Sequence, residues 1–257
     1  MNRLRAEGLS LGYDDTTVIT GLDVAVLDQR ITAIVGANAC GKSTLLRGLA
    51  RLLKPRQGAV HLDGKALASM STLDVAKVLG LLPQTPIAPD GITVADLVGR
   101  GRYPHQGWFR RWTDRDHEAV TRALAATDTA DLIDRPLHGL SGGQRQRVWV
   151  AMALAQDTDL LLLDEPTTYL DINHQVELLR LLRKLNAESG KTIVAVLHDL
   201  NLAGRFCDHI IAMDGGAIVA EGPPSEVITA ELVEKVFGLS CVIVTDPVAG
   251  TPIVVPA

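Results

Sequence analysis

Apolar and polar positions alternate over residues 1–31, and glycines and aspartates separate the apolar clusters. This alternation predicts short antiparallel strands joined by tight turns. The segment Ile31–Val35 is short and mainly apolar, which predicts a compact strand. A glycine-rich stretch follows, and a helical pattern then extends from Lys42 to about Leu53, where Pro55 is expected to end the helix.

Strand and helix patterns alternate again in the rest of the chain, around one long helical segment. Further strands are predicted at residues 60–63, 77–82, 160–163, 192–197, 210–213 and 218–220, with a terminal hairpin at 242–245 and 252–255. Helices are predicted at Val176–Asn186 and Asn201–Phe206. Strands that alternate with helices favour a parallel sheet, which the antiparallel strands precede.

Helical spacing with capping signals fills residues 86–136. Thr93-x-x-Asp96 and Thr113-x-x-Asp116 both resemble capping boxes, with aspartate in place of the usual glutamate or glutamine. Ser141-x-x-Gln144 opens a further helix, which is expected to run to about Gln156. The parallel sheet should therefore carry a helical insertion of roughly 50 to 70 residues.

Composition narrows the class of protein. The 257 residues carry 25 Lys and Arg against 30 Asp and Glu, a net charge of −5, and 47% are hydrophobic. This composition excludes disorder as the main state, and the acidic balance argues against nucleic acid as the main partner.

The mean hydropathy is +0.17, but the longest apolar runs, Val148–Ala155 and Thr192–Leu197, are far shorter than the ~20 residues of a membrane-spanning helix. The chain does not start like a signal peptide, and its three cysteines at unrelated spacings fit a reducing cytosol.

Residues 36–44 carry the first chemical motif, because they fit G-x-x-x-x-G-K-[ST] between a predicted strand and a predicted helix. In that setting backbone N–H groups and the helix dipole converge on the β- and γ-phosphates of a nucleotide. Lys42 would add a cation, and the Ser43 hydroxyl is placed to ligate Mg²⁺. An ordinary glycine turn would not need the Lys-Ser pair. The expected ATP-binding residues are Gly36, Ala37, Asn38, Ala39, Cys40, Gly41, Lys42, Ser43 and Thr44.

Cys40 allows two interpretations within this loop. It is either a small residue at a tolerant position or a thiol whose pKa is lowered by the nearby helix N-terminus, which would make it sensitive to oxidation. If alkylation of Cys40 leaves ATPase activity unchanged, the second interpretation is wrong.

A second candidate site follows the predicted strand Leu160–Leu163, which ends in Asp164 and Glu165. Two acids at the carboxyl end of a strand lie where open α/β sheets bind ligands. Asp164 would hold Mg²⁺, directly or through water, while Glu165 would polarise a water for in-line attack on the γ-phosphate. Either acid alone would also suit a strand-to-loop cap.

The segment Leu140-Ser141-Gly142-Gly143-Gln144 stands between the phosphate loop and the acidic strand. Locally it is only a capped helix that starts with glycines. Its position in this order of motifs, however, resembles the ATP-binding cassette (ABC) ATPases, and the resemblance covers essentially the whole chain. It implies an α/β fold: a P-loop NTPase (RecA-like) core with an N-terminal antiparallel β subdomain and an inserted α-helical signature subdomain. The implied boundaries are 1–85 and 157–257 for the core and 86–156 for the helical subdomain.

The resemblance also assigns roles to single residues. Tyr13 matches an aromatic residue that stacks on adenine, and Gln84 matches a glutamine that contacts Mg²⁺ or its water. Asp171 matches an aspartate that faces the partner subunit, and His198 matches a histidine that contacts the γ-phosphate. From the residues alone, Tyr13 also suits a surface position on a hairpin, and His198 a structural position at a strand end.

A dimer is the partner that the resemblance implies first. Two cassettes of the family pack head to tail, so that Ser141, Gly142, Gly143 and Gln144 of one copy face the γ-phosphate held by the loop of the other. The family often has proline and glycine where this chain has Ala37 and Ala39. Ala39 would carry a small energetic cost if its backbone needed a positive φ.

The stretch Gly99–Trp112 contains four of the nine aromatic residues, with arginines between them. Such a stretch suits protein docking, single-stranded nucleic acid, or a helix core with a solvated face. We expect docking, because the family contacts its membrane subunits in this region.

Residues 101–106, 164–172 and 246–256 resemble the ATPases of iron–siderophore importers, with vitamin B12 and haem importers as alternatives. The resemblance thus implies two membrane permease subunits, an extracytoplasmic siderophore-binding protein, no nucleic acid, and a place at the cytoplasmic face of the cell membrane. A soluble ABC ATPase outside transport and an ATP-binding module without hydrolysis are the other candidates.

Overall fold

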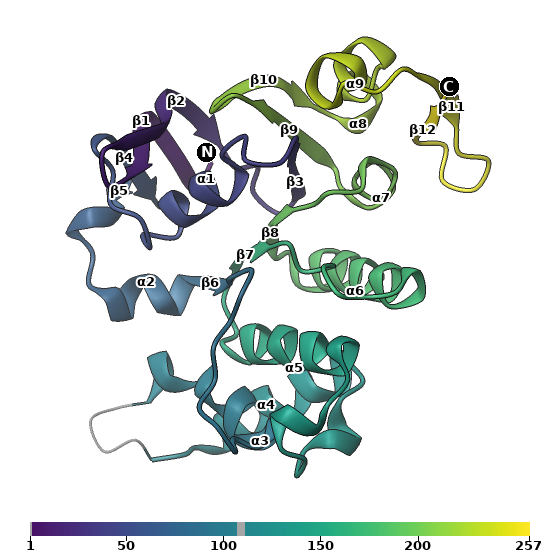
Figure 1. Cartoon of the computed structure of the whole chain (residues 1–257). Helices are drawn as coiled ribbons and strands as arrows, with labels where there is room; N and C mark the ends of the chain where they lie inside the picture. Colours follow the sequence, from purple (N-terminus) through teal and green to yellow (C-terminus); the bar gives the residue numbers. More distant parts are fainter. Residues whose placement is uncertain (1, 107–110) are drawn as a thin grey trace. The chain divides into compact units, whose positions relative to one another are not determined.

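The chain forms an α/β fold in two compact units (Figure 1). The computed structural model describes residues 2–106 and 111–257. One unit comprises Met1–Met70 with Thr192–Ala257, and the other comprises Ser71–Lys191. Among the described residues, none of the helices has the length and hydropathy that crossing a bilayer requires.

An antiparallel sheet opens the first unit, as the alternating pattern predicts. Its strand order is β2-β1-β4-β5, and its strands are β1 (Leu4–Tyr13), β2 (Thr16–Ala25), β4 (Gln57–Leu62) and β5 (Lys65–Ala66). The apolar positions of β1 and β2 face inward: Leu4, Leu9, Leu11 and Ile19 are each 0% exposed. The polar positions between them, such as Glu7 and Asp23, remain exposed.

A parallel layer forms the centre of the same unit. β3 (Ile31–Gly36) lies between β8 (Thr192–Val196) and β9 (His209–Asp214) and runs parallel to both, and β10 (Ala217–Gly222) pairs antiparallel with β9. Every residue of β3 and β8 is buried. This accounts for their predominance of Ile, Val and Ala, with one threonine in each strand, because a strand covered on both faces has no polar side.

Helices and a hairpin complete the first unit. They are α1 (Lys42–Leu49), the 3-10 turn Leu67–Ser69, α7 (Leu200–Phe206), α8 (Pro224–Val227), α9 (Ala230–Phe237), and the hairpin of β11 (Cys241–Thr245) and β12 (Pro252–Pro256). The prediction that the first helix reaches Leu53 is wrong, because it ends at Leu49. Arg51 takes φ 61°, and Leu52 N–H bonds back to the Arg47 carbonyl at 2.9 Å, so a left-handed residue closes the helix before Pro55.

The second unit places helices around two parallel strands, β6 (Leu79–Leu82) and β7 (Leu160–Asp164). Its helices are α2 (Thr72–Val78), α3 (Val94–Arg100), α4 (Asp114–Ala126), α5 (Gly142–Ala155) and α6 (Ile172–Ser189), with short 3-10 turns at Tyr103–His105, Ala130–Leu132 and Leu137–Gly139. The predicted caps are confirmed, as full capping boxes at Thr113 and Ser141 and as a single side-chain cap at Thr93. Thr93, Thr113 and Ser141 each accept a bond from the backbone N–H three residues on.

Two parts of the predicted pattern need correction. Residues 77–82 are not one strand, since Lys77 and Val78 end α2 and the strand starts at Leu79. Helix α2 begins at Thr72 because Ser71 Oγ accepts a hydrogen bond from Asp74 N–H at 3.1 Å. This cap favours a helix, although the residues that follow have the pattern of a strand. The predicted organisation also lacks α8 and α9, whose caps are Pro223 and Thr229.

Candidate functional site

The loop between β3 and α1 is shaped by two glycines. A Cβ atom on Gly36 would lie 2.2 Å from the Met213 carbonyl oxygen and 2.7 Å from Cys40 Sγ, so only glycine fits there. Gly41 caps α1 with φ 105°, a conformation that a side chain strongly disfavours. The loop therefore leads the chain abruptly from the end of a buried strand into a helix, and the unpaired N–H groups at the start of a helix suit an anion.

Lys42 is buried at the start of α1, with 5% of its surface exposed. Its ammonium group donates to the carbonyl oxygens of Gly36 at 2.9 Å and Ala37 at 2.8 Å, and to Cys40 Sγ at 4.0 Å. Three acceptors thus hold a buried cation in the curve of the loop, with no carboxylate among these partners. A phosphate group is the anion that such an arrangement suits.

Ala39 occupies the left-handed region, with φ 62°. The sequence predicts a small energetic cost at Ala39 if its φ is positive, and this condition is met. Alanine here adopts a conformation that glycine would adopt freely. Asn38 and Ala39 are exposed at the tip of the loop, whereas the Cys40 thiol is buried. Access of an oxidant to Cys40 would need the loop to open.

His198 and Tyr13 lie in the same unit as this loop. β8 runs parallel to β3 with Val196 opposite Ile34, so His198 follows β8 at the edge where Gly36 ends β3. Tyr13 ends β1 with 40% of its surface exposed, and its hydroxyl accepts a bond from Arg47 of α1 at 3.2 Å. The first unit thus brings the phosphate loop, the histidine and the aromatic residue to helix α1 and its neighbouring strand ends.

The acidic residues lie in the second unit. β6 and β7 are parallel, with Leu82 opposite Leu163, so Gln84 follows one strand at the edge where Asp164 ends the other. Asp164 is 2% exposed, Glu165 is half-buried and Gln84 is exposed. The unit therefore collects two carboxylates and a carboxamide at one sheet edge.

Backbone strain marks the loop that follows β7. Glu165 has φ 52° and Tyr169 has φ 66°, and neither is glycine. Hydrogen bonds hold this conformation: Thr168 Oγ1 donates to Glu165 Oε2 at 3.2 Å, and Gln175 Nε2 donates to the Leu170 carbonyl at 3.0 Å. Such strain is typical of a loop that presents a side chain for chemistry.

The glycines at the start of α5 are not required by the fold of this chain. Ser141 caps the helix through a reciprocal bond pair with Gln144, at 3.2 and 3.1 Å. A Cβ atom on Gly142 would lie 3.8 Å or more from any other residue, and one on Gly143 would lie 3.6 Å from Leu170. At these ordinary contact distances a side chain could be accommodated at both positions, and Ser141 and Gly142 are exposed at the start of the helix.

Asp171 caps α6 beside those glycines. Its carboxylate accepts bonds from the backbone N–H of His174 at 2.9 Å and from His174 Nδ1 at 2.8 Å. These bonds, the backbone bond foremost, hold the pKa of Asp171 below its usual value. The carboxylate is thus kept charged at the exposed end of a helix.

Comparisons with known proteins decide the family. Residues 19–168 match the family described as ABC transporter. The chain is 56% identical over 254 residues to the ferric enterobactin transport ATP-binding protein FepC of Escherichia coli (strain K12), which covers 99% of this chain and 94% of that protein. It is 49% identical over 253 residues to the iron(3+)-hydroxamate import ATP-binding protein FhuC of Bacillus subtilis (strain 168), over 98% and 94% of the two chains. The chain belongs to the ABC transporter family.

Solved structures agree with this assignment. A chain of an inward-facing ABC transporter assigned to the metal-chelate type superposes with a TM-score of 0.85 and 27% identity, over 100% of this chain and 98% of that chain. The dimeric structure of MJ0796, a bacterial ABC transporter cassette, gives a TM-score of 0.77 and 26% identity, over 86% and 98% of the two chains. The fold predicted from the sequence is confirmed, and the chain is an ATP-binding cassette ATPase.

Two glutamines of the cassette hold the loop after β7, a role that the sequence does not predict for either of them. Gln146 Nε2 on α5 donates to the Pro166 carbonyl at 2.9 Å, and Gln175 on α6 holds the next carbonyls of the same loop. Glutamines are common on helices, so only their contacts with the strained loop reveal this role. Together they fix the segment that begins with Glu165.

The expected docking stretch of the cassette is only partly available for contact. Arg102 is 6% exposed, and it bonds Asp116 at 2.8 Å and the Ala155 carbonyl at 2.7 Å, so its expected place on a docking surface is wrong. Tyr103 and Trp112 do lie on the surface, 49% and 45% exposed. Trp108, Phe109 and Arg110 lie outside the described residues.

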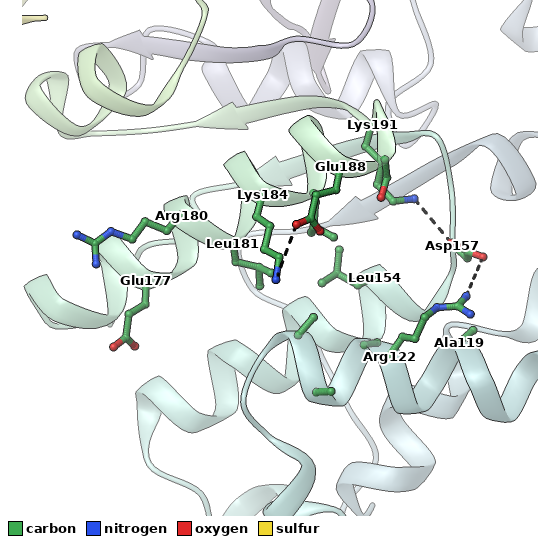
Figure 2. Close-up of a pocket in the computed structure, with 15 residues that line it drawn as sticks. Ala119, Arg122, Leu154, Asp157, Glu177, Arg180, Leu181, Lys184, Glu188 and Lys191 are labelled. Atoms are coloured by element: carbon green, nitrogen blue, oxygen red, sulfur yellow. Dashed lines mark hydrogen bonds and ion pairs between the residues drawn. The ribbon is translucent and has the colours of Figure 1, made fainter. Parts of the chain in front are cut away.

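A charged groove of about 560 Å³ lies between α4, the end of α5 and α6 of the cassette. Figure 2 shows Arg122 and Lys191 directed at Asp157, at 3.5 and 3.7 Å, and Lys184 paired with Glu188 at 4.0 Å. Because opposite charges pair along its rim, the groove offers no concentrated charge to a ligand.

Proposed function

We propose that this cassette is the ATP-hydrolysing subunit of an importer that carries ferric siderophores across the cytoplasmic membrane, at whose cytoplasmic face it is bound. The proposed solute rests on the nearly full-length similarity to FepC and FhuC, which are both named for ferric siderophore transport. Vitamin B12 or haem is the alternative cargo.

In the proposed mechanism the residues of the two units have distinct tasks. Lys42 and the backbone N–H groups of residues 36–44 grip the phosphates of ATP, and Tyr13 stacks on the adenine. Glu165 takes a proton from the attacking water, and His198 contacts the γ-phosphate. Residues 1–85 and 157–257 form the nucleotide-binding core in this proposal, and residues 86–156 form the helical subdomain.

The donor set also suits a magnesium ion. Mg²⁺ binds hard oxygen ligands and is held by one or two protein groups together with phosphates and water. Ser43 offers a hydroxyl, Asp164 a carboxylate that is 2% exposed, and Gln84 an amide oxygen. When bound with ATP, the ion would neutralise phosphate charge.

The exposure of Ser141 and Gly142 at the start of α5 supports a dimer in which each cassette completes the site of the other. Ser141, Gly142, Gly143 and Gln144 of one copy would meet the γ-phosphate held by its partner, with Asp171 nearby at the interface. Two membrane permease subunits would receive the resulting motion, and the exposed Tyr103 and Trp112 offer aromatic surface for that contact. An extracytoplasmic siderophore-binding protein would deliver the solute.

The role of Glu165 is tested by Glu165→Gln, with Glu177→Gln, an exposed glutamate on α6, as the matched control. The first variant should bind ATP, accumulate as a dimer in light scattering, and lose about 10² or more in kcat. Lys42→Ala should instead weaken ATP binding itself. Normal turnover by Glu165→Gln would contradict the proposed mechanism.

The solute is tested by uptake in cells that lack the chromosomal copy of this gene. Labelled ferric enterobactin, a ferric hydroxamate, haem and vitamin B12 are offered in parallel, and the wild-type chain or Glu165→Gln is supplied on a plasmid. We expect only the ferric siderophores to enter, and only with the wild-type chain. Uptake of vitamin B12 or haem instead would overturn the proposed cargo.

A further inference from the structure

The terminal hairpin is fastened to α7 by one asparagine. Val254 N–H of β12 donates to Asn201 Oδ1 at 2.7 Å, and Asn201 Nδ2 donates to the Val254 carbonyl at 3.3 Å. A carboxamide has both a donor and an acceptor, so one side chain satisfies both backbone groups of a strand residue. Val254 is buried, at 8% exposed, which makes these bonds costly to lose.

Further contacts tie the hairpin to the same helix. Arg205 of α7 lies 3.7 Å from the Asp246 carboxylate, which itself accepts a bond from Val248 N–H at 2.8 Å in the turn of the hairpin. A Cβ atom on Gly204 would lie 3.2 Å from the Pro252 carbonyl oxygen and 2.9 Å from Ile228. Helix α7 is therefore packed closely between the hairpin and the segment after α8.

The same helix begins directly after His198. Asp199 caps α7 by accepting a bond from Leu202 N–H at 2.9 Å, and on the other side Leu197 N–H bonds the Ile34 carbonyl of β3 at 3.1 Å. His198 thus stands between a strand that the sheet fixes and a helix of seven residues. A helix this short is not stable alone, so its position depends on what packs against it.

We propose that Asn201 is a positioning residue for His198, and that the terminal hairpin takes part in ATP hydrolysis by holding α7 through this side chain. The inference rests on the proposed contact between His198 and the γ-phosphate. Loss of the amide would leave the Val254 backbone groups unpaired and release α7 on one side. The grip of Lys42 on the loop carbonyls involves none of these contacts, so chemistry should suffer while nucleotide binding does not.

The test is a double-mutant cycle in the full-length chain between Asn201→Ala and His198→Ala. Steady-state ATPase assays give kcat and KM, and titration with a fluorescent ATP analogue gives Kd. The matched control is Asn186→Ala, because Asn186 is also a half-buried helix asparagine whose amide bonds a backbone carbonyl, that of Lys191, at 2.7 Å. If Asn201→Ala does not fold, Asn201→Asp takes its place, because it keeps the acceptor for Val254 N–H but loses the donor to the Val254 carbonyl.

We expect Asn201→Ala to lower kcat about 10-fold, as displacement of a positioned group does, with Kd unchanged within about 2-fold. In the His198→Ala background the same substitution should have no further effect on kcat, because it acts through that histidine. The Asn186→Ala control should keep its kcat. Equal losses from Asn201→Ala in both backgrounds, or a normal kcat for Asn201→Ala alone, would overturn the inference. A normal kcat for His198→Ala would instead refute the proposed role of the histidine.

Discussion

Gln146 Nε2 donates a hydrogen bond to the Pro166 carbonyl oxygen across 2.9 Å, and this bond joins the helix that starts at Ser141 to the loop that carries Glu165. Pro166 is buried, and Glu165 beside it has a positive φ, so the bond supports a strained backbone at the position of the proposed general base. In the proposed dimer, α5 would therefore contact the partner's nucleotide at its start. Five residues further on, Gln146 of the same helix would hold the loop that carries the general base of its own site.

Gln146→Ala should lower kcat about 10-fold with little change in ATP affinity, because it frees the loop that orients Glu165 and leaves the phosphate loop intact. ATPase kinetics and nucleotide titration measure the two effects separately. Gln156→Ala is the control, since Gln156 lies just beyond the other end of α5 and its amide bonds the Leu79 carbonyl at 3.2 Å. An equal fall in kcat for both variants would show a general loss of structure instead.

Local sequence patterns predicted the strands and the caps because their causes are local. The buried runs of β3, β7 and β8 contain almost only aliphatic side chains, and the caps at Thr93, Thr113 and Ser141 need only residues three positions apart. The phosphate loop was predictable for the same reason, since all its residues are contiguous.

Features that depend on distant partners were not predictable from the sequence. The arginine-rich stretch predicts a docking role for Arg102, but this residue is buried because it bonds Asp116, fourteen residues further along the chain. Gln146 and Asn201 bond backbone groups that are 20 and 53 residues away. Every residue has a backbone carbonyl, so the sequence does not indicate which one a distant side chain will bond. The early end of α1 likewise depends on Arg51 adopting a left-handed conformation that few arginines adopt.

The Arg102–Asp116 pair should matter much more to stability than a surface pair of the same kind. The side chains are 7% and 4% exposed, so Arg102→Ala leaves a buried carboxylate without its cation and should lower the free energy of unfolding by about 3–5 kcal/mol. Arg122→Ala removes the pair with Asp157 shown in Figure 2, whose side chains are 63% and 50% exposed, and should cost about 0–1 kcal/mol. Urea unfolding of both variants measures the contrast, and similar losses would contradict it.

The same pair should make stability depend on pH in a defined direction. Burial raises the pKa of Asp116, but hydrogen bonds from Arg102 and Thr113 outweigh it and hold the pKa below its usual value. A carboxyl group whose pKa is lowered by folding stabilises the protein above its unfolded pKa of about 3.9, and this contribution is lost as the pH falls through the folded pKa. Asp116→Asn should therefore be less stable than wild type at pH 7, with a difference that shrinks below about pH 4. A difference in unfolding free energy that stays constant from pH 7 to pH 3 would refute this assignment.

Two alanine-to-glycine substitutions in the phosphate loop should have opposite effects on stability. Ala39 has φ 62°, where an L side chain is strained by about 1–2 kcal/mol and glycine is not. Ala39→Gly relieves that strain, but it also raises the entropy of the unfolded chain, which costs about 0.4–1 kcal/mol of stability. The free energy of unfolding should therefore rise by about 0.5 kcal/mol. Ala37 is not among the residues with positive φ, so Ala37→Gly has only the entropic cost and should lose about 0.4–1 kcal/mol. Denaturant midpoints that shift in the same direction for both variants would show that the strain at Ala39 does not govern the stability of this loop.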